Sequence, residues 1–122
     1  MPRKRWSSSA ENMDTYKVIL SPHAYAQIVD HHDYLRFSLL NEQAAESMWR
    51  DAFETVRRLS AAAGSLGFCR TYELRKRGYR LIRFKTHRYV MIYRVEAQTV
   101  FIEAVYHELQ SYESLFLKNL NI

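Results

Sequence analysis

The residues best suited to chemistry in this 122-residue chain are a group of cations in its second half. Nine of the eighteen Lys and Arg residues fall between Arg70 and Arg94, where a single acid, Glu73, leaves a net charge of +8. The guanidinium of arginine is planar, stays charged and matches phosphate oxygens. A positive field confined to one segment is suited to binding a polyanion. We expect nucleic-acid contacts from six of these cations: Arg75, Lys76, Arg77, Arg80, Arg83 and Lys85.

Most of these cations alternate with apolar side chains, in a pattern typical of β-strands. We expect strands over residues 79–84, 87–95 and 99–106, which are rich in Tyr, Ile, Val and Phe. Their short connections predict an antiparallel meander. In a regular third strand, side chains 99, 101, 103, 105 and 107 share one face, and 100, 102, 104 and 106 share the other. An apolar, β-branched run at residues 16–20 predicts a further strand, which we expect to complete the sheet as a fourth member.

Two helices are predicted between the first strand and the meander. Ser21 followed by Pro22 is typical of a helix start, and apolar residues recur at helical spacing to about residue 39. Asn41 can cap a second helix, whose apolar stripe runs to Ala63 before Gly64 and Gly67 end it. So short a connection predicts an antiparallel hairpin. A short amphipathic helix is expected over about residues 109–116.

Length and composition indicate one domain, which we place at residues 15–122. Residues 1–14 are polar and Ser-rich and read as a disordered or non-native extension, with Met13 as an alternative start. Cys69 is the single cysteine, so no intramolecular disulfide can form, and no apolar run is long enough for a membrane helix. We therefore expect a cytoplasmic protein.

The succession of elements resembles the RelE/ParE superfamily of bacterial toxins. The likeness covers about residues 15–112 and includes SPHA at 21–24, HRYVMIYRV at 87–95 and VFIEAVYH at 100–107. It implies an α+β fold in which an N-terminal strand precedes an antiparallel two-helix hairpin, packed on a mainly antiparallel four-stranded twisted sheet with a short C-terminal helix. It also implies the toxin of a type II toxin–antitoxin system of the plasmid-stabilisation kind, held inactive by a cognate antitoxin.

The resemblance further suggests catalytic residues. Glu73, Arg88 and His107 look like the acid, arginine and near-terminal histidine of YoeB-like nucleases, where they would act as general base, phosphate ligand and general acid. In that pattern a tyrosine follows the histidine, whereas Glu108 stands here, and Tyr112 would have to replace it. The chain also continues fifteen residues past His107, which is more like ParE-type members.

Three functions remain open at this stage. The first is ribosome-dependent mRNA cleavage by a metal-independent endoribonuclease, for which three such groups are chemically sufficient. The alternative is ParE-type, non-catalytic inhibition of DNA gyrase through the helical hairpin and the C-terminal segment. The third is an RNA-binding module without a toxin role. No cofactor, metal or membrane is expected, and a homodimer or a hetero-oligomer with the antitoxin is possible.

Each candidate residue also has a purely structural interpretation. Glu73 can form a surface ion pair with Arg75 or Arg77, and His107 can close the end of the sheet. The tyrosines of the strands are expected in the core. An acidic antitoxin segment is expected in a basic groove edged by Tyr79, Phe84 and Tyr89.

Overall fold

The computed structural model describes residues 15–120, so the expected extension at 1–14 lies outside the described residues. The first element of the described part is β1 (Lys17–Leu20), which passes directly into α2 (Pro22–Asp33). The Ser21 hydroxyl accepts a hydrogen bond from the Ala24 amide at 3.0 Å, and Pro22 occupies the first helical turn, as the sequence predicts.

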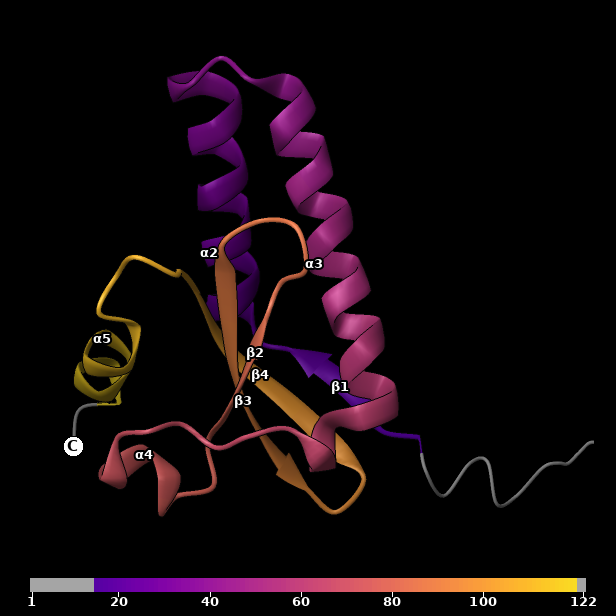
Figure 1. The fold of residues 1–122 in the computed structure, drawn as a ribbon, viewed down its shortest axis with the longest axis vertical. Coiled ribbons are helices and arrows are strands. Elements are labelled where there is room, and N and C mark those ends of the chain that lie inside the picture. The colour runs from indigo at the N-terminus through magenta and orange to yellow at the C-terminus, as the bar shows by residue number, and fades with distance from the viewer. Residues whose placement is uncertain (1–14, 121–122) are drawn as a thin grey trace, which may run out of the picture.

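The hairpin turns through an irregular connection between α2 and α3 (Glu42–Ala62). A π-helical turn, η1 (Tyr34–Ser38), continues α2, and Leu40 then takes a φ of 53°. The Asn41 side-chain oxygen accepts from the Ala44 amide at 2.9 Å and caps α3 as expected. The 3₁₀ turn η2 (Ala63–Ser65) ends α3, and Figure 1 shows α2 and α3 side by side.

The sheet brings together strands that are distant in sequence. Its other strands are β2 (Arg80–Arg83), β3 (Tyr89–Glu96) and β4 (Thr99–His107), in the order β1-β4-β3-β2. The pairs β2–β3 and β3–β4 are antiparallel, whereas β1 runs parallel to β4 with Lys17 opposite Thr99. The expected α+β fold with a mainly antiparallel four-stranded sheet is therefore confirmed.

A β-bulge in β4 overturns the simple alternation expected for that strand. The register pairs Ile92 with Ala104 but Tyr93 with Ile102, which leaves Glu103 as an extra residue. Beyond it the two faces exchange, so Val105 joins Val100 and Ile102 in the core under the hairpin. Ala104 and Tyr106 instead face the opposite side of the sheet.

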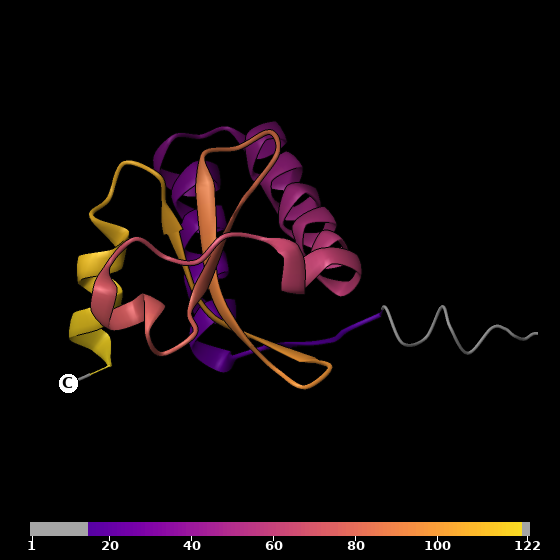
Figure 2. The same cartoon turned by 60° about the horizontal axis from the view of Figure 1, so that its bottom comes forward.

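Both faces of the sheet are covered. The hairpin covers one face, while α4 (Tyr72–Arg75) and α5 (Tyr112–Asn119) lie on the other (Figures 1 and 2). The core beneath these two short helices contains Leu74, Val90, Ile92 and Phe116. The C-terminal helix is confirmed with a later start than expected, and α4 was not expected. Within residues 15–120 no helix combines the length and apolar character needed to span a membrane.

Candidate functional site

Two of the expected catalytic residues lie at one end of the sheet. The register places Arg83 opposite Val90 and Tyr89 opposite His107, so the end of β2, the start of β3 and the end of β4 meet there. The Arg88 carbonyl accepts a hydrogen bond from the Glu108 amide at 2.7 Å. The structure thus brings the backbones of Arg88 and His107 to neighbouring positions on adjacent strands.

Glu108 is the acid of this sheet end. Its carboxylate lies 3.4 Å from Nε of Arg83 and 3.5 Å from Nε of Arg88. Arg83 also donates to the Tyr112 hydroxyl at 3.3 Å. The two arginines therefore share one carboxylate from within the chain, although more than half of each arginine side chain remains exposed. Any phosphate approaching them meets the charge of Glu108 as well.

His107 is held by local contacts. Its Nδ1 accepts a hydrogen bond from the Leu109 amide at 3.1 Å, and its ring stands edge-on to buried Tyr89 with the ring centres 5.2 Å apart. His31 of α2 packs on the same tyrosine at 4.7 Å and contacts the Val105 carbonyl through Nε2. Burial lowers the pKa of His31, and nearby His107 lowers it further, while the Val105 hydrogen bond opposes this. The two histidines thus flank one aromatic ring.

Glu73 is not brought to this end of the sheet. It lies in α4, before the start of β2, and forms an ion pair with Lys76 at 3.5 Å. Arg83 is the last residue of β2, and the four residues of this strand span about 10 Å. Figure 1 shows α4 and the β2–β3 connection at opposite ends of β2. An ion pair was expected for Glu73, but with Arg75 or Arg77 as its partner.

The six expected nucleic-acid contacts divide into two groups. Arg83 and Lys85 lie at the sheet end just described, whereas Arg75, Lys76, Arg77 and Arg80 surround α4 and the start of β2. Acids that follow the cationic segment in sequence pair with its arginines. Glu103 and Glu96 pair with Arg94, and Glu108 pairs with the sheet-end arginines. The positive field in space is consequently smaller than the sequence segment alone implies.

The groove expected at Tyr79, Phe84 and Tyr89 is wrong. These side chains are 9%, 6% and 5% exposed, so none of them can form the edge of an open groove. Phe84 and Tyr89 pack in the core under the hairpin, while Tyr79 packs against Phe116 on the other face. Their burial agrees with the alternative expectation that the strand tyrosines are core residues.

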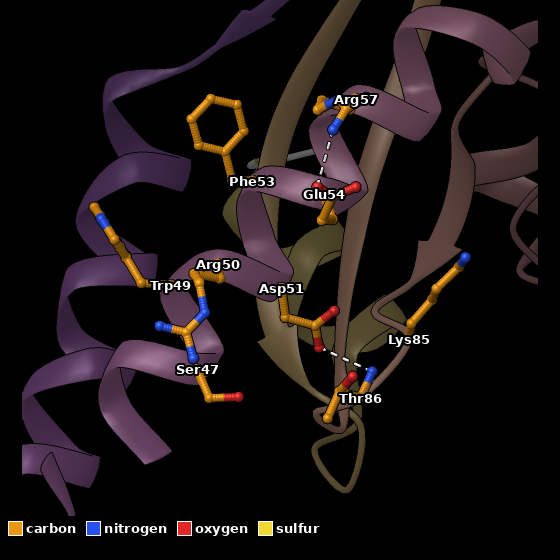
Figure 3. A pocket seen from close by; sticks show the side chains of 9 residues that line it. All are labelled: Ser47, Trp49, Arg50, Asp51, Phe53, Glu54, Arg57, Lys85 and Thr86. Carbon is orange, nitrogen blue, oxygen red and sulfur yellow. Dashed lines mark hydrogen bonds and ion pairs between the residues drawn. The ribbon is translucent and has the colours of Figure 1, made fainter. Parts of the chain in front are cut away.

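An open pocket of about 810 Å³ lies instead beside α3 (Figure 3). Exposed Trp49 and Phe53 and the cations Arg50 and Lys85 line it. At its base Asp51 is 7% exposed, and its Oδ2 accepts from the amides of Thr86 and His87 at 2.9 and 2.7 Å. An adjoining groove of about 330 Å³, apolar over most of its lining, runs between α2, α3 and β1.

Asp51 is a charged residue on the buried side of α3, and it was not singled out from the sequence. A signal was nevertheless present, because Asp51 and Thr55 follow the buried Met48 by three and seven residues, which is the spacing of the buried stripe. The hydroxyl of buried Thr55 donates a hydrogen bond to the Asp51 carbonyl at 2.7 Å.

Comparisons with known proteins point to one family. The family model described as the ParE toxin of the type II toxin–antitoxin system, parDE, matches residues 18–112. Among solved structures, a chain of the chromosomal ParDE toxin–antitoxin system from P. aeruginosa is 17% identical, with a TM-score of 0.63. The match covers 77% of this chain and 97% of that one, and it shows a shared fold. No curated protein matches the sequence.

Proposed function

We propose, since the chain belongs to the ParE family of type II toxin–antitoxin toxins, that it inhibits DNA gyrase by binding and without catalysing a reaction. The family membership confirms the resemblance to the RelE/ParE superfamily and makes the chain the toxin of such a pair. The observation that carries the non-catalytic proposal is the distance of Glu73 from Arg88 and His107. Glu73 stands before β2, and His107 stands beyond its far end.

The charges at the sheet end support the same proposal. A nuclease needs an uncompensated cation at the phosphate to stabilise the developing charge. Here Glu108 supplies a carboxylate to both Arg83 and Arg88. Tyr112, which would have to replace the missing tyrosine, already accepts a hydrogen bond from Arg83. Ribosome-dependent mRNA cleavage is the second candidate, because Arg88 and His107 still share one end of the sheet.

The helical hairpin is the surface that we assign to target recognition. Three large apolar side chains at its turn, Phe37, Leu39 and Leu40, are 63%, 54% and 83% exposed. On α3 of the same hairpin, Trp49 and Phe53 are also exposed, at 41% and 68% (Figure 3). A large exposed apolar patch on a small domain is typical of a protein-binding surface.

The antitoxin is expected to bind the same face. The groove between α2, α3 and β1 offers an apolar floor of Ile28, Ala52 and Val56. Arg50, Arg57 and Lys85 surround the neighbouring pocket, with Glu54 and Asp51 as its acids. An amphipathic segment with acids along one side would suit both surfaces, and its binding would block the target. Simultaneous, independent binding of antitoxin and gyrase would contradict this arrangement.

The first test is pulse-labelling of DNA and protein synthesis in a bacterial host after induction of the toxin. We expect DNA synthesis to stop first and the purified chain to inhibit supercoiling by gyrase. Glu73→Ala should keep both effects. Glu96→Ala is its matched control, because Glu96 is likewise an exposed acid paired with a cation, Arg94, and lies outside the surfaces assigned to the target and the antitoxin.

The opposite pattern would support the nuclease. Protein synthesis would then stop first, and Glu73→Ala would be harmless while Glu96→Ala remained toxic. A His107→Ala variant adds an independent comparison, provided that circular dichroism shows a folded chain. Loss of RNA cleavage in both Glu73→Ala and His107→Ala would refute the gyrase proposal.

A further inference from the structure

A second cationic surface lies around α4, at the end of β2 away from His107. We define the α4 patch as Phe68, Tyr72, Arg75, Lys76, Arg77 and Arg80. We propose that the α4 patch binds single-stranded nucleic acid, with bases stacked on its two aromatic rings and phosphates held by its cations. The charges here were expected from the sequence, but the rings and the single-strand preference follow from the geometry.

The two rings of the α4 patch are exposed and lie next to cations. The Arg80 guanidinium lies 3.9 Å from the centre of the Phe68 ring and also donates to the Leu66 carbonyl. The Arg75 guanidinium and the Lys76 ammonium lie 5.8 and 5.2 Å from the centre of the Tyr72 ring. Phe68 is 47% exposed and Tyr72 is 62% exposed. Aromatic rings of this kind stack on any base, while neighbouring cations hold the backbone.

The patch stands on a well-fixed segment. The Cys69 amide donates to the Tyr79 carbonyl at 3.0 Å, and the Leu81 amide donates to the Gly67 carbonyl at 3.2 Å, so residues 67–69 pair along the edge of β2. Fully buried Leu74 anchors α4 in the core. Glu113 of α5 accepts the amides of Arg70 and Thr71 at 3.1 and 2.7 Å. A fixed platform lowers the entropy lost when a strand binds.

The charge of the α4 patch remains largely uncompensated. The patch has four cations, and Glu73, the acid that lies among them in sequence, pairs with Lys76. Arg75 and Arg77 have no ion pair within the part of the chain that the structure describes, and Arg75 donates only to the Arg70 carbonyl at 2.9 Å. The carboxylate of nearby Glu113 accepts hydrogen bonds from the backbone amides of Arg70 and Thr71. The exposed rings distinguish this surface from one suited to an acidic protein, for which cations alone would suffice.

The test measures binding of the full-length chain to fluorescein-labelled oligothymidylate by fluorescence anisotropy. We expect the single strand to bind more tightly than a duplex of equal length. Phe68→Leu and Tyr72→Leu remove a ring and keep the charge, and each should weaken single-strand binding at least about five-fold, the lower end for base stacking. Arg77→Ala should reduce the slope of log affinity against log salt by about 0.7.

The matched control is Phe37→Leu. Phe37 is an equally exposed ring with the Arg36 guanidinium 5.2 Å from its centre, but it lies at the turn of the hairpin, so its loss should leave the affinity unchanged. Both patch rings are exposed, and circular dichroism checks that their replacement leaves the chain folded. Equal affinity for duplex and single strand, or unchanged affinity in both ring variants, would overturn the proposal. If the ring variants keep their affinity and polyglutamate displaces the oligothymidylate from them, the partner is an acidic protein instead. The assay contains neither gyrase nor antitoxin, so its result is independent of the proposed target.

Discussion

Asp51 should hold the β2–β3 connection against α3, and its replacement by alanine tests that role. Asp51 is 7% exposed, and its carboxylate accepts hydrogen bonds from two backbone amides, those of Thr86 and His87. A hydrogen bond to a charged group contributes about 1.5–3 kcal/mol. Both amides belong to a connection that solvent reaches, so they regain water, and we take the lower value for each. Asp51→Ala should therefore lower the free energy of unfolding by about 3 kcal/mol.

Equilibrium unfolding in urea, followed by circular dichroism, measures this loss. Domains of this kind have about 5–15 kcal/mol of stability, so the shift in midpoint should be large. Asp51→Asn keeps an oxygen that can accept both amides but removes the charge, so it should lose about half as much. Glu54→Ala removes an exposed ion pair on the same helix and should change stability by no more than about 0.5 kcal/mol. The reasoning is refuted if Asp51→Ala is as stable as Glu54→Ala.

Glu113 and Cys69 provide further predictions on the opposite face of the sheet. Burial acts to raise the pKa of Glu113, but hydrogen bonds from Thr71 and Arg70 and the charge of Arg70 outweigh it and lower the pKa from 4.5. The stability that Glu113 contributes should be complete above that pH and lost as pH falls through the folded-state pKa. The free energies of unfolding of wild type and Glu113→Gln, measured by urea titration, should therefore converge at acidic pH. A difference that stays constant with pH would contradict this. Burial, with a contribution from the Glu113 charge, raises the pKa of the Cys69 thiol to about 12. A colorimetric thiol reagent should therefore react slowly with the folded chain and rapidly in denaturant, and fast labelling without denaturant would show that the thiol is accessible.

The order of elements could be predicted because local signals define it. Ser21, Pro22 and Asn41 mark the helix starts, and the capping contacts of Ser21 and Asn41 are present. The strands are rich in β-branched and aromatic residues, and their positions were predicted within about two residues. Such signals are short-range, so one sequence carries them plainly.

The departures come from long-range contacts. The bulge at Glu103 depends on the register with β3, and no local pattern in β4 distinguishes it from regular alternation. The short helix α4 depends on Leu74 reaching a core formed with Phe116. For the same reason the site was predicted only in part. Glu108 lies next to His107 in sequence, but its pairing with Arg83 depends on how β2 and β4 are placed.

The position of β1 also bears on how the chain is made. Lys17 pairs with Thr99, so β1 leaves the ribosome well before β4 and has to wait for it before it can join the sheet. Contacts between such distant residues slow folding, since a long loop must close first. A growing chain that stops before residue 99 lacks the strand that joins β1 to β3. The folded toxin can therefore form only after β4 has been synthesised, and chains that stop before it should be harmless.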